Sequence, residues 1–450
     1  MFNKRIRFYP HLALKLIKRH GLIIALSFVL GILVFNYFPR LWQKQKLTLR
    51  IGVVNQCDPR NLPDSIACLI SQGLTRVDQD SNLQPGIAVS WQINDQQKKY
   101  TFKLRDDLFW HDGSKVQAKD IHYHFPDLNL TDQDEQTIEI NLEEKFSPLL
   151  ILLSRPVFKE KLIGVGEYKV QRTRYHGSNI KSLLLKPAEN DKNKKKLEFK
   201  FYPNEESIRN AFKIGEIDII YGIQNQQDLV YFPNIKTESA ISANQYTAIF
   251  LNLNKDTFQD KSIRQALAYA ITKPQGKSRA KGPISPSSWA YNNFVKTYDF
   301  NIAHAKELLE DSSDISFGLF TFPDLLELAK KIKEDWQEIG VHVEIHVVNF
   351  IPDDYDAILL TQAIPKDPDQ YWFWHSSQEQ TNISHLKNPR IDQLLEEGRT
   401  ILDQEKRREF YIEFQRFLLE ESPAIFINHP TYYYIYRRGF ENFELPLYNR

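Results

Sequence analysis

Cysteine and methionine are nearly absent: the 450-residue chain has one methionine and two cysteines, Cys57 and Cys68. Two cysteines cannot supply the dense disulfide framework of a small secreted domain. They leave two alternatives open, one disulfide that closes a short loop or two buried thiols. Because no histidine stands near them, the pair does not indicate a zinc site.

The motifs of common enzyme classes are also missing. The sequence has no nucleophile elbow, no phosphate-cradling glycine loop and no HExxH helix. Asp106, Asp107 and Asp112 fit turns rather than an acid–base pair. The histidines of segment 122–124 and His375 lack a carboxylate or cysteine at a spacing that would complete a metal site. We therefore expect a protein that is not an enzyme and carries neither a cofactor nor a metal.

Acidic residues are absent from positions 1–50, which hold ten of the 58 Lys and Arg residues. Residues 51–450 therefore carry 48 basic against 57 acidic side chains, a net charge of −9. Phosphate binding requires a concentrated basic face, so this balance argues against a nucleic-acid partner.

The basic N-terminal region surrounds one apolar stretch of eighteen residues, Gly21 to Phe38. As a helix it would span roughly 27 Å, close to the hydrocarbon thickness of a membrane. Six Lys or Arg precede it and four follow, which predicts a cytoplasmic N-terminus and an external bulk. Neither a small-x-small cleavage site nor a lipid-accepting cysteine follows, which favours an uncleaved signal anchor over a cleaved signal peptide. We expect a single-pass protein of the cell membrane.

Strand and helix patterns alternate from residue 46 to the C-terminus. Apolar alternation predicts a strand over 46–54 and a hairpin over 91–104, and 3.6-residue spacing predicts a helix over 322–339. This alternation favours α/β layers. Further predictions are helices over 63–73, 205–214, 262–271, 390–402 and 404–419, and strands over 137–142, 218–221, 341–348, 355–360 and 424–428.

Several short segments, some of which contain glycine or proline, occur in a fixed order along this part. They are Gln72–Arg76, Leu83–Trp91, Tyr100–Asp107, Trp110–Gly113, Gly164–Val170, Phe250–Asn254, Ile263–Ile271 and Asn388–Asp392. In this order they closely resemble the family 5 extracellular solute-binding proteins, which include the dipeptide, oligopeptide and nickel receptors of ABC importers. The resemblance covers roughly residues 48–430.

The resemblance implies an α/β, two-lobed, hinged fold like that of the periplasmic binding proteins, of class II, with a reduced extra subdomain. The hinge is expected near Phe250–Asn254 and Pro423–Asn428. The expected parts are a cytoplasmic segment 1–20, the anchor 21–38, a linker 39–47, lobe I from 48–84, 159–250 and 428–450, a small subdomain 85–158 and lobe II 251–427.

The function implied is delivery of a small peptide-like or other polar solute to the permease subunits of an ABC importer, by a monomer tethered through residues 21–38. The alternative is a ligand sensor or interaction protein that kept the fold without transport.

Ligand choice is the weakest part of the resemblance. Ile364 stands where peptide-binding members carry an aspartate for the peptide's ammonium group, and an apolar residue cannot pair with that charge. Lys366 is either a contact for an anionic group or a solvated loop lysine, and the aromatic run 371–375 either lines the cleft or packs in the core. The expected ligand-binding residues are Asn55, Trp289, Tyr291, Ile364, Lys366, Tyr371, Trp372 and Trp374.

Overall fold

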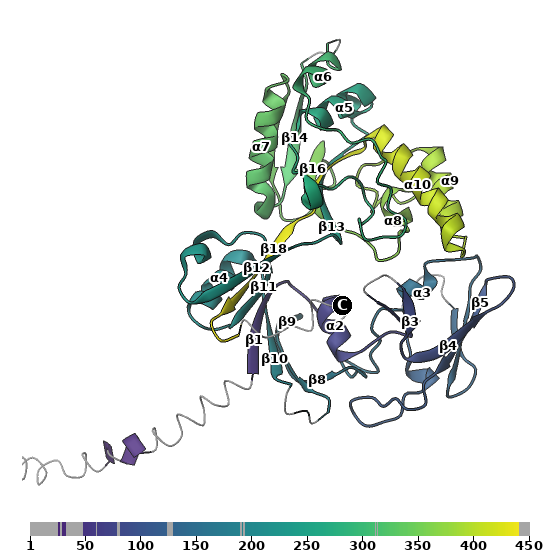
Figure 1. Cartoon of the computed structure of the whole chain (residues 1–450), viewed down its shortest axis with the longest axis vertical. Coiled ribbons are helices and arrows are strands. Elements are labelled where there is room, and N and C mark those ends of the chain that lie inside the picture. The colour runs from purple at the N-terminus through teal and green to yellow at the C-terminus, as the bar shows by residue number, and fades with distance from the viewer. Residues whose placement is uncertain are drawn as a thin grey trace, which may run out of the picture.

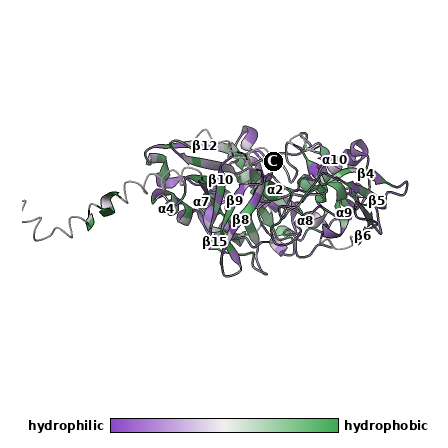
Figure 2. Ribbon diagram, turned by 90° about the horizontal axis from the view of Figure 1, so that it is seen from below, coloured by the Kyte–Doolittle hydropathy of each residue, from purple (hydrophilic) through white to green (hydrophobic). Residues whose placement is uncertain are grey.

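The computed structural model describes residues 26–27, 29–32, 48–59, 61–78, 82–123, 129–189, 191, 194–310, 312 and 314–440. The described residues from 48 onward form two lobes, with the small subdomain beside the first of them (Figure 1). Hydrophobic and hydrophilic residues are intermixed along the elements of both lobes (Figure 2), as expected where each element buries one face.

Lobe I contains a seven-stranded mixed sheet. Its first strand, β1 (Thr48–Val54), pairs in parallel with one strand on each side, and its buried residues Leu49, Ile51 and Val53 alternate as the sequence predicts. The strand order is β12 (Ile235–Ile241), β18 (Thr431–Arg437), β11 (Ile219–Ile223), β1, β10 (Lys196–Tyr202), β9 (Asn179–Pro187) and β8 (Tyr168–His176).

The small subdomain is a four-stranded antiparallel sheet with its own hydrophobic core. Its predicted hairpin is confirmed, and the adjacent turn at Asp112–Gly113 is stabilised by the Ser114 N–H, which donates to Asp112 at 2.9 Å. A two-stranded sheet, β2 (Thr75–Val77) and β3 (Leu83–Pro85), leads into it from lobe I. The strand order is β4 (Ala88–Ile93), β5 (Lys99–Leu104), β7 (Thr137–Asn141) and β6 (Asn129–Asp132).

Lobe II contains a five-stranded sheet covered by helices (Figure 1). The longest helix, α10 (Gln404–Glu421), begins at Asp403, whose carboxylate accepts the Lys406 N–H at 2.9 Å. Helix α9 (Pro389–Gly398) is capped in the same way by Asn388, which explains the Asn-Pro pair in the sequence. The strand order is β15 (His342–Val347), β14 (Ser316–Thr321), β16 (Ala357–Ala363), β13 (Gln245–Leu251) and β17 (Ala424–Asn428).

The remaining α-helices from residue 48 onward have between 4 and 12 residues. They are α2 (Asp64–Ile70), α3 (Leu149–Leu152), α4 (Glu205–Lys213), α5 (Lys261–Ala270), α6 (Ile302–Glu307), α7 (Leu326–Gln337) and α8 (Tyr371–Trp374).

The chain crosses between the lobes at residues 242–244 and 429–430, which corrects the expected hinge positions. Phe250–Asn254 and 424–428 lie inside lobe II, because β13 and β17 are neighbours in its sheet. The two crossovers contact each other directly. The Ser242 N–H donates to the carbonyl of Pro430 at 2.9 Å, and Nδ1 of His429 donates to the carbonyl of Gln245 at 2.7 Å. These two segments are therefore the candidate hinge.

Two predictions concern the N-terminal part of the chain. Most of the stretch 21–38 lies outside the described residues, and among those that are described no helix is long and apolar enough to cross a membrane. Cys57 and Cys68 are not joined by a disulfide, so of the two alternatives the structure has thiols. Burial raises the pKa of the Cys57 thiol to about 11.

Candidate ligand cavity between the lobes

A cavity of about 410 Å³ lies where lobe II approaches lobe I. Its lobe I side comes from the end of α2, from β2 and β3, and from the loop before β8. Ser154 of the small subdomain also lines the cavity, and among the described residues lobe II contributes Lys366 alone. The lining residues are Cys68, Ser71, Gln72, Arg76, Val77, Asp78, Gln84, Ser154, Val165, Gly166, Glu167 and Lys366.

The lobe I side of the cavity is built from closely packed backbone. A Cβ atom on Gly164 would overlap the carbonyl oxygen of Ile70, and one on Gly73 would overlap that of Leu153. Glycine is required at both positions because two chain segments approach more closely than any side chain permits. His111 completes this packing, since its N–H donates to the carbonyl of Gly164 and its Nε2 lies 2.9 Å from that of Gly166.

The lobe II side is positioned by buried ion pairs. Arg407 binds Asp367 through two nitrogens, at 2.5 and 2.8 Å, and each side chain is 5% exposed. Arg399 lies 3.2 Å from Asp369. Burial would lower the pKa of Arg407, but the charge and hydrogen bonds of Asp367 raise it on balance. These pairs fix the loop that precedes α8, which is the loop that carries Lys366.

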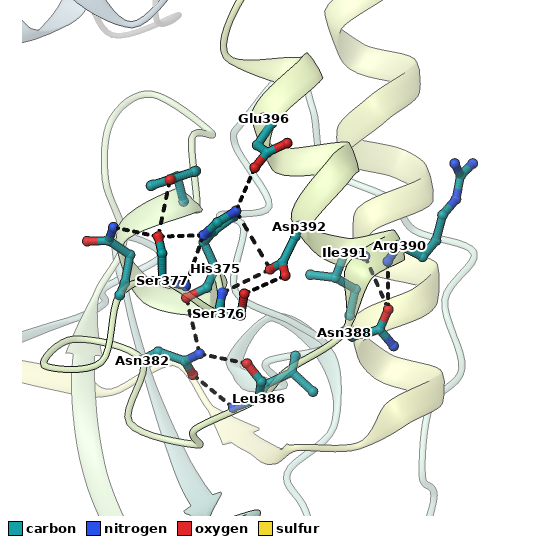
Figure 3. Close-up of polar contacts among 12 residues, drawn as sticks. His375, Ser376, Ser377, Asn382, Leu386, Asn388, Arg390, Ile391, Asp392 and Glu396 are labelled. Atoms are coloured by element: carbon teal, nitrogen blue, oxygen red, sulfur yellow. Dashed lines mark hydrogen bonds and ion pairs between the residues drawn. The ribbon is translucent and has the colours of Figure 1, made fainter.

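A histidine network ties the segment that follows α8 to α9 (Figure 3). Nδ1 of His375 accepts the Ser377 N–H at 3.1 Å and lies 2.8 Å from Oγ of Ser377, while Nε2 lies 3.1 Å from Glu396. Asp392 accepts both the N–H and the hydroxyl of Ser376. The atom order is that of a hydrolase triad. However, the N–H and the hydroxyl of Ser377 both lie at Nδ1 of His375, and His375 is only 6% exposed. The network therefore serves to hold the segment after α8 against α9.

A second contact joins the lobes away from the crossovers. The Ser147 N–H, just before α3 of the small subdomain, donates to the carbonyl of Arg399 at 2.8 Å. The guanidinium of Arg399 also lies 5.0 Å from the ring centre of Phe146. The lower ends of α9 and α10 reach the small subdomain in Figure 1. The lobes therefore meet both at the crossovers and at this distant point.

Of the eight expected ligand-binding residues, Lys366 lines the cavity. Ile364 is 8% exposed and packs in the core of lobe II, and its N–H donates to the carbonyl of Asn244 at 2.8 Å. Asn55 is half-buried after β1, where its N–H donates to the carbonyl of Tyr202. Neither Ile364 nor Asn55 reaches the cavity, because other contacts of its own lobe hold it in place.

The five aromatic candidates lie around the helices of lobe II rather than in the cavity. Trp374 is 1% exposed and stacks on Phe250, which fits the core alternative. Tyr371 stacks on His375 at 4.1 Å between ring centres. Trp289 and Tyr291 pack beside the buried cluster of lobe II, and Trp372 is 49% exposed.

The lobe I lining residues were not predicted, although one signal pointed to them. Gly73, Gly86, Gly164 and Gly166 all lie in segments that carry the family resemblance, and a glycine that permits close backbone approach often lies beside a binding surface. Their neighbours Gln72, Val165 and Glu167 line the cavity.

No group of three or more His, Cys, Asp or Glu side chains is placed to hold a metal ion in the part of the chain that the structure describes. His124 lies outside that part.

Comparisons with known proteins decide the family. Residues 82–384 match the bacterial extracellular solute-binding proteins, family 5. The chain belongs to this family. It is 22% identical over 420 residues to the probable D,D-dipeptide-binding periplasmic protein DdpA of Escherichia coli K12, covering 78% of this chain and 80% of that protein. It is 26% identical over 241 residues to the oligopeptide-binding protein AppA of Bacillus subtilis, covering 44% of each.

The same fold occurs in solved structures of binding proteins. NikZ of Campylobacter jejuni, solved with Ni(L-His), matches with a TM-score of 0.75 at 24% identity, over 87% of this chain and 94% of that chain. AppA of B. subtilis, solved with a nonapeptide, matches with a TM-score of 0.71 at 20% identity, over 89% and 96%. The predicted family and the two-lobed α/β fold are thus confirmed, and this chain is an extracytoplasmic solute-binding protein.

Proposed function

We propose that this solute-binding protein is tethered to the cell membrane by residues 21–38 and delivers a small polar solute to the permease subunits of an ABC importer. The observation that carries the proposal is the cavity of about 410 Å³, which residues of both lobes line. A solute there contacts both lobes at once, so its binding favours the closed arrangement over an open one. The volume suits a small molecule or a short peptide-like solute.

The ligand-binding residues in this proposal are those of the cavity, with Lys366 as the contact from lobe II. Trp372 and Tyr371 remain candidates for a wider cleft in an open form. We propose that the protein acts without catalysis and as a monomer, since its cavity is completed by one chain.

The test of solute binding is native mass spectrometry of the full-length chain, extracted gently from its membrane in detergent. We expect a bound small molecule that is released on mild unfolding. A chain that is always empty, and that binds nothing in a broad metabolite and peptide library, would contradict the receptor function.

The test of the tether is alkaline washing of membranes that contain the full-length chain. We expect the chain to stay in the membrane pellet and a variant that lacks residues 1–47 to be released. Recovery of the full-length chain in the wash would refute a spanning segment.

The alternative, a sensor or interaction protein that no longer serves transport, predicts binding without uptake. Uptake of the labelled ligand by cells with and without this chain separates the two. Equal uptake in both would favour the sensor.

A further inference from the structure

Arg76 brings an unpaired positive charge to the lobe I side of the cavity. It lies on β2 with an exposed side chain, between the buried Thr75 and the half-buried Val77. Its Nε donates to the carbonyl of Pro85 at 3.0 Å. It forms no ion pair with any carboxylate among the described residues. The outer face of its guanidinium therefore remains available to a ligand.

Lys366 brings a second charge from the opposite lobe. Ile364, two residues before it, and Asp367, directly after it, are buried at 8% and 4% exposed. Ile364 is held by packing in lobe II and by its hydrogen bond to Asn244 of the crossover, and Asp367 is held by Arg407. The exposed side chain of Lys366 therefore projects from a rigid segment into the cavity. Within the part of the chain that the structure describes, it has neither an ion-pair nor a hydrogen-bond partner.

The two acids among the described lining residues already have hydrogen-bond or ion-pair partners. Asp78 accepts the Asn82 N–H at 2.8 Å and the amide of Gln84 at 3.0 Å. Glu167 lies 3.2 Å from the ammonium of Lys194. Within the described lining, Glu167 is therefore paired with a cation and Asp78 is held by neutral donors, whereas Arg76 and Lys366, one from each lobe, have no ion-pair partner among the described residues.

We propose that the solute carries an acidic group, a carboxylate or a phosphate, that Arg76 and Lys366 bind together across the cavity. This inference rests on the proposed function and specifies its substrate class. Arg and Lys are the side chains that bind such oxyanions through charge-assisted hydrogen bonds. An anion attracts both cations only when the lobes are close, so it couples recognition to closure. The side-chain amide of Gln72 lines the same cavity and can bind the uncharged remainder of the solute.

The experiment measures binding to the full-length chain of matched pairs of compounds that differ in charge. Succinate is compared with succinamide, and glycerol 3-phosphate with glycerol, by the shift in melting temperature and by calorimetry. Arg76→Gln and Lys366→Gln are compared with Arg174→Gln and Lys331→Gln, which replace exposed cations outside the cavity.

We expect an acidic member of at least one pair to bind and its neutral partner not to bind. Loss of one charge-assisted contact should weaken binding about tenfold in Arg76→Gln and in Lys366→Gln, and the two control variants should bind as the wild type does. The pair that responds distinguishes a carboxylate from a phosphate.

Preferential binding of the neutral compounds, or unchanged affinity in both cavity variants, would overturn the inference while leaving a receptor. If no acidic compound binds, the inference also fails. In that case a bound small molecule detected by native mass spectrometry would still support the proposed function. The absence of any bound molecule would contradict both the acidic-solute inference and the proposed function.

Discussion

On the lobe I side of the cavity, Gly73 and Gly164 lie against carbonyl groups of neighbouring segments, whereas on the lobe II side the buried Asp367 and Asp369 are paired with the buried Arg407 and the half-buried Arg399. The lobe I side is held by close backbone packing that only glycine permits, and the lobe II side is held by ion pairs. The first should be sensitive to any added atom, and the second to any change that leaves a charge buried alone.

This difference bears on function as well as stability. Close backbone packing shapes the surface of lobe I, and ten of its described residues line the cavity, with Ser154 of the small subdomain as an eleventh. The ion pairs of lobe II hold a short loop from which Lys366 projects. Lobe I therefore defines most of the shape of the site, and lobe II adds a charged contact that depends on a loop being held in place.

The largest effect is expected from Arg407→Met in lobe II. Removal of this guanidinium leaves Asp367, which is 4% exposed, without its partner. Breaking a buried pair in this way costs about 3–5 kcal/mol of the free energy of unfolding, and urea denaturation measures it. The control is Arg416→Met, which removes an exposed pair with Glu413 and should cost less than about 1 kcal/mol. Equal losses in the two variants would show that lobe II does not depend on its buried charges.

A similar but smaller loss is expected from Ile364→Asp. The side chain is 8% exposed inside lobe II, so the carboxylate would enter an apolar cluster and cost about 3 kcal/mol. Free dipeptides should bind no better, because the new charge does not face the cavity. Ile364→Val is the matched control, at about 1 kcal/mol. A stable Ile364→Asp protein that gains dipeptide affinity would instead place this residue at the ligand.

The sequence predicted much of the fold and little of the site. The strand over 424–428 matches β17 residue for residue, because its apolar pattern is local. The helix expected over 63–73 ends at Ile70 instead. The next residues are extended because the hydroxyl of Ser71 donates to Val157, a contact 86 residues away.

The site depends on contacts of that long-range kind. Ile364 was expected at the ligand from its place in a motif, yet its orientation is set by the hydrogen bond to Asn244 and by packing in lobe II. Arg76 and Lys366 lie 290 positions apart, and only the approach of the two lobes brings them to one cavity. Periodicity cannot reveal such a pairing.

On the lobe I side, Gly164→Ala should cost about 1–3 kcal/mol, because the added methyl group overlaps the backbone of Ile70 and forces two segments apart. The shift in melting temperature measures this cost, and ligand affinity should fall with it, since Val165 and Gly166 line the cavity. Gly282→Ala is the control, because its nearest neighbour would be the Leu419 side chain at 3.5 Å. If both variants are equally stable, backbone packing is not what fixes this side.

The smallest effect is a pH dependence that also comes from the lobe I side. Nε2 of His111 lies 2.9 Å from the Gly166 carbonyl, to which it donates, and its buried Nδ1 has no partner among the described residues. Burial therefore lowers the pKa of His111; the charge of Lys169 lowers it further, and the Gly166 hydrogen bond and Asp112 oppose the shift.

An unfolded histidine titrates near pH 6.5. Because the native His111 titrates lower, the unfolded chain binds more protons below that pH, and the free energy of unfolding falls as the pH falls from about 7 towards 5. Above about pH 7.5 both forms are neutral and the contribution is constant. Burial lowers the pKa of His385 and His429 as well, so the informative quantity is the difference between the wild type and His111→Gln. Urea titrations at pH 5 and pH 8 should show a smaller pH dependence in the variant. An identical dependence would mean that the native structure rearranges to give the protonated Nδ1 of His111 a hydrogen-bond acceptor. The lobe I side would then be more adjustable than its glycine packing implies.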